Sequence, residues 1–224
     1  MASLRFELDR AGFPMVWVDA INAYVHWIPV TKVQFEYFLC AVPDSHFDAG
    51  WYDEILYLNP RVAPNEIRAD NYWNAFLTGV MPSEVQRYAR WCGDEYTVPT
   101  LNDWFAAYTA LKALPPEPLS AFDSMGEVRE RVRTVLTRLD SASRIALKEA
   151  GYERTLADQM LMRMGVMEWV ECRGRHFQWG GMGETFSSFY GGLFTPDHGQ
   201  PHVPNNPETE RLHAYGFRLI WRPV

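Results

Sequence analysis

The chain has 224 residues, of which 47% are hydrophobic and 15% aromatic, which is enough material for a well-packed core. Its formal net charge is −7 without a cluster of Lys and Arg, which argues against DNA or RNA as a partner. It has no apolar run near the ~20 residues of a membrane span, no apolar signal-peptide core at its start, and three cysteines, a poor disulfide framework. We therefore expect one cytoplasmic domain, residues 1–224, without a membrane or nucleic-acid partner.

The N-terminal part predicts two strands and a helix. Apolar and aromatic residues alternate from Phe13 to Val30 on either side of a polar turn, as in a strand, a turn and a second strand. Thr31 follows as a helix N-cap, with Gln34 at the spacing of a capping box. Lys32 to Cys40 is therefore predicted to be a short amphipathic helix.

The next part predicts a loop and two helices. Prolines and scattered aromatic residues from Val42 to Thr78 favour a loop that is pinned to the core. Pro82 then opens a helix that Gly93 ends. Thr100 is a natural N-cap for another helix, whose inner face includes Trp104.

Residues 119–150 have the most regular helical pattern in the chain. A capping-box spacing at Ser124 precedes a stripe of apolar residues that ends at Leu139. A second, shorter helix is predicted from Ser141 to Ala150. We expect these helices to pack on the core or to dock on a partner.

The last third predicts two strands separated by irregular chain. Val166 to Val170 is an apolar, strand-like run that Glu168 interrupts. Long loops are expected from Gly174 to Pro207, and Tyr215 to Trp221 closes the chain as a strand. Together these elements predict an α+β fold that is irregular and rich in loops.

Five short strings resemble the formylglycine-generating enzyme (sulfatase-modifying factor) family, and they occur in that family's order. They are Pro29-Val30-Thr31-Lys32-Val33-Gln34-Phe35; Tyr88-Ala89-Arg90-Trp91-Cys92-Gly93 with Val98-Pro99-Thr100-Leu101-Asn102-Asp103-Trp104; Gly165-Val166-Met167-Glu168-Trp169-Val170; Trp179-Gly180-Gly181-Met182; and Gly216-Phe217-Arg218-Leu219. The resemblance implies a C-type-lectin-like fold. The helices around 119–150 would be an insertion in place of the family's glycine-rich loops.

The sequence also departs from that family where its oxidases hold copper. The resemblance places the copper-binding cysteine pair between the fourth and fifth strings, whereas this chain has no cysteine after Cys172. In addition, Trp179 stands where the family has Arg before the paired glycines. We therefore expect a non-catalytic member, with no catalytic residue and no catalytic thiol pair.

Other cofactor sites have little support in the sequence. His198 and His202 have a spacing that suits a metal on a helix, but the prolines and glycine around them exclude that helix. The oxygen-rich strings of calcium-dependent lectins are absent, so a calcium site is possible in principle but unsupported. We expect no metal and no cofactor.

A second group of residues is predicted to be structural. Glu168 and Arg218 each lie in an apolar strand, where an unpaired charge costs several kcal/mol. Each is therefore expected to have a buried partner, as an ion pair or in a network with the backbone, rather than to act as a general acid or base. Trp91, Trp104 and Trp169 lie in the same family-like strings and are assigned to the core.

The segment from Phe177 to His202 has the composition of a binding surface. Its aromatic residues offer contact area, and its Ser and Gly residues offer adaptable hydrogen bonds. The predicted ligand-binding residues are Trp179, Glu184, Phe186, Ser188, Phe189, Tyr190, Phe194 and His198. The alternative is that the phenylalanines anchor a long loop to the core. The resemblance adds that variable proteins of diversity-generating retroelements expose their variable residues in this stretch.

These observations predict a binding or sensor module that recognises a protein or peptide through its C-terminal loops. The resemblance implies that it works with a separate effector, such as a protease, in a prokaryotic defence or signalling system. The main alternative is a metal-dependent oxidase of the formylglycine-generating type with a rearranged site. A second alternative is a variable protein of a diversity-generating retroelement or a lectin-like ligand binder.

Overall fold

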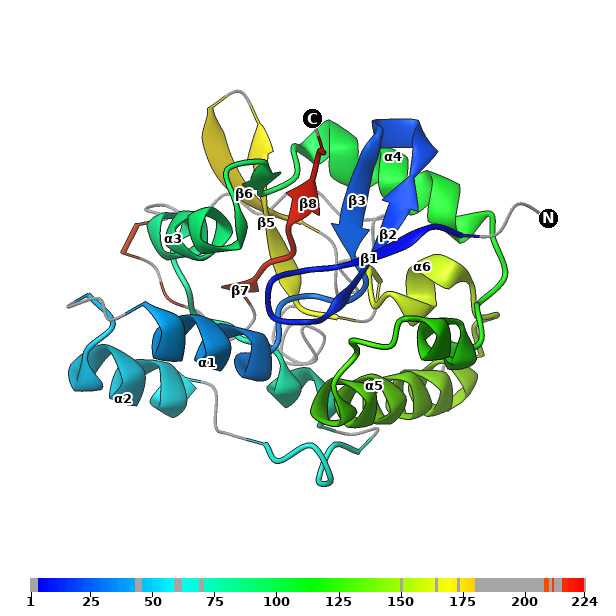
Figure 1. The fold of residues 1–224 in the computed structure, drawn as a ribbon, viewed down its shortest axis with the longest axis horizontal. Helices are drawn as coiled ribbons and strands as arrows, with labels where there is room; N and C mark the ends of the chain where they lie inside the picture. Colours follow the sequence, from blue (N-terminus) through cyan, green and yellow to red (C-terminus); the bar gives the residue numbers. More distant parts are fainter. Residues whose placement is uncertain are drawn as a thin grey trace.

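A computed structural model describes residues 4–42, 46–58, 62–68, 71–149, 151–163, 165–172, 174–179, 208–209, 211 and 215–223, without the side chains of Trp73, Cys172 and 175–179. Helices and strands are mixed (Figure 1). The strands are β1 (Phe6–Leu8), β2 (Pro14–Val18), β3 (Ala23–His26), β4 (Tyr96–Thr97), β5 (Met167–Cys172), β6 (Arg175–Trp179), β7 (Tyr215–Gly216) and β8 (Ile220–Trp221). The α-helices are α1 (Lys32–Ala41), α2 (Ala49–Leu58), α3 (Pro82–Cys92), α4 (Leu101–Lys112), α5 (Glu130–Glu149) and α6 (Leu156–Gln159).

The described strands form two sheets. The larger has the order β1-β2-β3-β8-β4 with antiparallel neighbours, so the last strand of the chain lies between β3 and β4. The smaller has the order β6-β5-β7, in which β5 and β6 form an antiparallel hairpin and β7 runs parallel to β5. Figure 1 shows that hairpin beside β8, with α3 and the pair α1 and α2 on the same side of the molecule.

The N-terminal prediction is confirmed. β2 and β3 are joined by a 3-10 turn, η1 (Asp19–Ile21), and Asn22 follows it with a φ of 50°. Thr31 caps α1 as predicted: the Gln34 N–H donates to Thr31 Oγ1 at 3.2 Å, and the Thr31 N–H donates to Gln34 Oε1 at 2.8 Å. The capping box therefore fixes the point at which the chain leaves β3 and enters α1.

The helices predicted after Pro82 and Thr100 are also confirmed. α3 begins at Pro82 and ends before Gly93, and α4 begins after Thr100, which forms a capping box with Asp103. Both helices bury an aromatic face. That of α3 includes Tyr88 and Trp91, and that of α4 includes Trp104.

The region predicted as a loop from Val42 to Thr78 instead contains α2. Asp48 accepts a hydrogen bond from the Trp51 N–H at 2.9 Å, and Trp51 and Ile55, four positions apart, are buried. The Trp51 ring stacks on Phe35 of α1 with ring centroids 5.7 Å apart. A prediction of loop was wrong here because tertiary packing on α1 supports a helix whose own sequence has few helix signals. A 3-10 turn, η2 (Tyr72–Ala75), lies in the same region.

The helical region around 119–150 is present, but its division into two helices was wrong. Ser124 ends a 3-10 helix, η3 (Leu119–Ser124), and its hydroxyl bonds the Ala121 carbonyl rather than capping a helix. α5 then runs unbroken through Ser141, because the apolar stripe continues through Ala142 to Leu147. The Ser143 hydroxyl donates to the Asp140 carbonyl within the helix, so this polar group does not interrupt it.

The C-terminal strands differ in part from the prediction. β5 is confirmed. Residues 175–179 were expected to be part of a loop, but they pair with β5 and form the strand β6. Tyr215 to Trp221 is not one strand: β7 and β8 belong to different sheets. Gly216 allows this crossing, since a Cβ there would press on Val166 and lie 3.2 Å from the Leu77 carbonyl oxygen. Most of the expected loop, 180–207, lies outside the described residues.

The structure is mixed helix and sheet, as expected for an α+β protein. Its core contains buried residues from both sheets and from the helices around them. Among the described residues, no helix is both long enough and apolar enough to cross a membrane.

Candidate functional site

Glu168 and Arg218 form a fully buried ion pair. Arg218 Nε lies 2.6 Å from Glu168 Oε2, and Nη2 lies 2.7 Å from Oε1, so the contact is bidentate. Both side chains are 0% exposed. Glu168 comes from β5 and Arg218 from the crossing between β7 and β8, so the pair joins the two sheets at the crossing point.

The remaining polar atoms of this pair also have partners. Trp104 of α4 donates its indole N–H to Glu168 Oε2 at 2.9 Å. Arg218 donates to the carbonyl oxygens of His26 and Met160 at 3.0 Å and 2.9 Å. The expected partners of Glu168 and Arg218 are thus each other, the backbone and Trp104. Carboxylate oxygens occupied in this way hold elements together and leave little capacity for a substrate.

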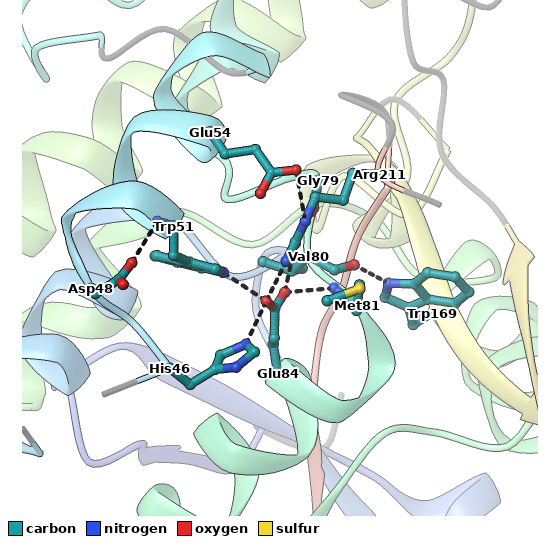
Figure 2. Close-up of polar contacts among 10 residues, drawn as sticks. All are labelled: His46, Asp48, Trp51, Glu54, Gly79, Val80, Met81, Glu84, Trp169 and Arg211. Carbon is teal, nitrogen blue, oxygen red and sulfur yellow. Dashed lines mark hydrogen bonds and ion pairs between the residues drawn. The ribbon is translucent and has the colours of Figure 1, made fainter. Parts of the chain in front are cut away.

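A second buried carboxylate, Glu84, organises a larger network in the first turn of α3 (Figure 2). Its Oε1 lies 2.6 Å from the Trp51 indole nitrogen, 2.9 Å from His46 Nε2 and 2.6 Å from Arg211 Nη2. Its Oε2 accepts from the Met81 N–H and from Arg211 Nη1, both at 2.8 Å. Glu84 itself is fully buried.

These contacts determine the ionisation state of Glu84. Burial alone would raise the pKa of this carboxyl, but hydrogen bonds from Arg211, Met81 and His46 outweigh it and hold the pKa below its ordinary value. Glu84 is therefore ionised at neutral pH. Its two oxygens accept from donors in four different parts of the chain, which is the role of an anchor rather than of a general base.

Arg211 is the partner that connects this network to the C-terminal part of the chain. Besides Glu84, it bonds the Gly79 carbonyl oxygen at 2.7 Å and approaches Glu54 at 3.2 Å. Burial opposes its charge, yet Glu84 and Glu54 together raise the pKa of Arg211 above its ordinary value. The guanidinium therefore fixes residue 211 against α2 and α3.

A hydrogen bond from Trp169 connects the two networks. Trp169, the neighbour of Glu168 in β5, donates its indole N–H to the Val80 carbonyl oxygen at 2.8 Å. Val80 immediately precedes Met81, whose N–H bonds Glu84. Figure 2 shows Trp169 at the Val80 carbonyl and the guanidinium of Arg211 at Glu84.

Residues 180–207 connect parts of the chain that these networks hold. At one end the backbone of Trp179, the last residue of β6, pairs with Glu168 in the sheet register. At the other end, Arg211 is fixed by Glu84. Trp179 and Arg211 therefore contact the same part of the core, formed by β5, α2 and the start of α3, which we call the platform.

The residues predicted to be structural lie in the core. Trp91 packs against Phe38 and Tyr88, with ring centroids 5.7 Å and 5.5 Å away. Trp104 and Trp169 make the hydrogen bonds given above. Of the predicted ligand-binding residues, Trp179 is placed by its backbone alone. The others lie outside the described residues: Glu184, Phe186, Ser188, Phe189, Tyr190, Phe194 and His198.

The Glu84 network was missed by sequence reasoning. Glu84 did have a signal, because it lies at the third position of a helix that begins at Pro82, where a side chain reaches back to the backbone of the N-cap residue. For His46 and Trp51, the sequence gives no signal of a buried polar contact beyond the aromatic content of their region. Arg211 lies in polar sequence with no pattern that points to a buried partner.

A third polar cluster lies beneath the β1–β2 turn. Asp9 accepts from the Phe13 N–H at 2.7 Å and from Gln34 Nε2 at 3.0 Å. His26 Nε2 lies 3.3 Å from Asp9 Oδ2, and His26 Nδ1 accepts from the Leu219 N–H at 3.3 Å. These contacts join the turn, α1 and the β8 segment, and all the participating side chains are buried.

The described thiols do not resemble activated nucleophiles. Cys40 is exposed on α1, and Cys92 is half-buried at the end of α3. Burial, with a smaller contribution from the charge of Asp9, raises the pKa of Cys92 above its ordinary value. Reactive thiols need the opposite shift.

Among the described residues, no group of three or more His, Cys, Asp or Glu side chains is arranged to hold a metal ion. Comparison with known proteins gives no class for the chain: no family model, curated protein or solved structure matches it.

Proposed function

We propose that this chain is a non-catalytic binding module that presents the segment 177–202 to a protein or peptide partner. The observation that carries the proposal is that the chain is held on both flanks of the undescribed stretch 180–207, by the β5–β6 register before it and by the Arg211–Glu84 pair after it. Binding residues are commonly placed on chain segments that a rigid scaffold positions. The aromatic, Ser and Gly content of 177–202 suits that use.

The chemistry of the described polar groups supports the same proposal. The oxygens of Glu84 and Glu168 are occupied by donors from the protein itself. The Cys92 thiol has a raised pKa, which favours the inert protonated form. These groups stabilise the platform, and the partner would bind to the segment 177–202.

We further propose that the fold is C-type-lectin-like, of the formylglycine-generating enzyme kind. The support is that three of the family-like strings meet at one network. Trp104, Glu168 and Arg218 come from separate strings and share hydrogen bonds in the core. A crystal structure that superposes on members of that family would test the proposal, and one with a different strand order would contradict it. As in that family's signalling members, a separate effector would carry the output.

Site-specific photo-cross-linking tests the binding function. A benzophenone amino acid at Tyr190, within the proposed surface, is compared with one at Phe105, which is 51% exposed on the outer face of α4. In lysate of the source cells, we expect one protein to cross-link at position 190 and not at position 105. The captured protein is then purified and its affinity measured by calorimetry. Equal cross-linking at both positions, or no binding by the purified protein, would contradict the proposal.

A further inference from the structure

The C-terminal half of α5 has a basic face that takes no part in the networks described above. Arg138, Arg144 and Lys148 are exposed on it. They share this face with Ile145, which lies seven positions after Arg138 and three before Lys148. About 15 Å of helix axis separates Arg138 from Lys148, and Figure 1 shows α5 along the lower right edge of the molecule. The face can therefore contact about three turns of a partner helix.

The cations in the first half of α5 have partners within the protein. Arg131 lies 3.8 Å from Glu36, and Arg133 lies 2.8 Å from Asp123. Both arginine side chains are about half exposed, at 56% and 47%. The positive charge of this half is therefore neutralised by the chain itself.

The cations in the second half have no such partners. Among the described residues, Arg138, Arg144 and Lys148 form no ion pair with a carboxylate. Asp140 lies four positions before Arg144, where it could pair with it, but Arg154 occupies this carboxylate. The charge of these three side chains is therefore available to a ligand.

Helix stability does not account for these cations. A positive charge near a helix C-terminus interacts favourably with the helix dipole, but of the three only Lys148 lies in the last turn. Arg144 and Lys148 are four positions apart, a spacing at which like charges repel each other. The exposed Glu149 lies five positions after Arg144, which does not bring their side chains together. An anionic ligand would relieve the repulsion.

Ile145 gives the basic face an apolar contact point. It is 44% exposed, whereas Leu139, Ala142 and Leu147 on the inner side of the helix are buried. A bare anion would not use Ile145. A peptide with acidic and apolar side chains would contact both the cations and the aliphatic residue between them.

Other anionic partners fit this face less well. Three unpaired cations in a chain of net charge −7 are far from the basic surface that nucleic acids require. One aliphatic side chain is also far from the apolar area that a membrane-surface helix buries. The combination of cations with Ile145 favours a protein partner.

We propose that this face of α5 docks an acidic segment of a partner protein. Its carboxylates would bind Arg138, Arg144 and Lys148, and an apolar side chain would cover Ile145. Charge complementarity selects this occupant, and the planar fork of a guanidinium matches a carboxylate. The site does not depend on the segment 177–202, which carries the function proposed above.

The test uses two fluorescein-labelled peptides. The acidic probe consists of two repeats of Ala-Leu-Glu-Ala-Glu-Leu-Ala, which on a helix places Leu along one stripe with Glu on both sides of it. The second peptide has Gln in place of each Glu. Fluorescence anisotropy should show saturable binding of the acidic peptide, at least about tenfold tighter than that of its Gln counterpart.

Two double variants locate the site on α5. Arg138→Ala/Arg144→Ala removes two of the unpaired cations and should weaken binding of the acidic peptide at least about tenfold. The matched control, Arg131→Ala/Arg133→Ala, removes the same charge from the same helix, but from residues that already have carboxylate partners, and it should bind like the wild type. Circular dichroism should show both variants folded, because the replaced side chains are exposed and Ala favours a helix.

Methyl NMR places the peptide. The Cδ1 methyl resonance of Ile145, assigned with Ile145→Val, should shift on addition of the acidic peptide. The shift and the affinity should persist when Phe186, Phe189 and Phe194 are replaced by Ser, since those residues belong to the other proposed surface. A failure of the function proposed above would therefore leave this result unchanged.

Oligothymidylate and vesicles that contain phosphatidylserine test the two other classes of anionic partner. Tighter binding of either one than of the acidic peptide would overturn the proposal. Absent binding, equal binding of both peptides, an equal loss in the control variant, or an unmoved Ile145 resonance would each overturn it as well.

Discussion

Arg211 places two guanidinium nitrogens on the two oxygens of Glu84, at 2.6 Å and 2.8 Å, across 127 positions of sequence. The carboxylate is fully buried and the guanidinium nearly so. This contact fixes Arg211, which follows the segment 180–207 in sequence, to the first turn of α3.

Replacing Glu84 by Gln should therefore destabilise the protein strongly. The variant leaves Arg211 partly buried without its main counter-charge, and breaking a buried pair on one side costs about 3–5 kcal/mol. Urea unfolding measures the change. Glu54→Gln is the matched control, because Glu54 also contacts Arg211 but is 55% exposed, and it should change the unfolding free energy by about 0.5 kcal/mol. An equal loss of unfolding free energy in the two variants would contradict the prediction that the buried contact stabilises the protein more than the exposed one.

The same pair predicts a pH dependence. Because the pKa of Glu84 is lowered in the folded protein, its contribution is fully present above the ordinary value of 4.5 and is lost as the pH falls through the folded value. The difference in unfolding free energy between wild type and Glu84→Gln should thus be constant near neutrality and shrink below pH 4.5. A difference that grows as the pH falls would contradict the assigned ionisation.

Glu168→Gln should be destabilising in the same range, about 3–5 kcal/mol, because it leaves the fully buried Arg218 charge uncompensated. Trp104→Phe removes one donor to Glu168 while it keeps most of the buried ring, so a loss of about 1–2 kcal/mol is expected. Thermal and urea unfolding give both values. An unchanged stability of Glu168→Gln, accompanied by loss of an activity, would overturn the structural role.

An aromatic row across the larger sheet makes another prediction. Trp221 of β8 stacks on Tyr24 of β3 and on Tyr96 of β4, with ring centroids 5.1 Å and 5.8 Å away, and the two tyrosines are its partners in the sheet register. Because the faces of these rings are covered by one another, we interpret the row as stabilising the sheet rather than binding a ligand. Trp221→Ala should cost about 2–3 kcal/mol, whereas Phe105→Ala, on an exposed ring, should cost about 0.5 kcal/mol.

The thiols separate the binding module from the oxidase alternative. At pH 7, iodoacetamide should modify the exposed Cys40 much faster than Cys92, whose raised pKa keeps it protonated. Peptide mass spectrometry at successive times gives both rates. If Cys92 reacts as fast as Cys40, its thiol is activated, and a rearranged catalytic site regains support.

The sequence predicted those features that depend on local patterns. The capping box at Thr31, the N-cap at Thr100 and the alternation in β2 and β3 are local, and the structure contains them. A charge in an apolar strand likewise indicated that Glu168 needs a partner. Local patterns could not reveal Arg211, whose partner is distant and whose neighbours are polar. They also missed α2, which depends on the packing of Trp51 against Phe35.

The measurement that tests the account most directly asks whether the platform and the binding segment are separable. One variant replaces Phe186, Phe189, Tyr190 and Phe194 by Ser, and it is compared with Glu168→Gln in thermal unfolding and in calorimetric titration with the purified cross-linked partner. We predict that the segment variant keeps its unfolding midpoint to within about 2 °C and loses at least about tenfold in affinity. A midpoint that falls as far as that of Glu168→Gln, or an unchanged affinity, would show that these aromatic residues belong to the core and would contradict the account.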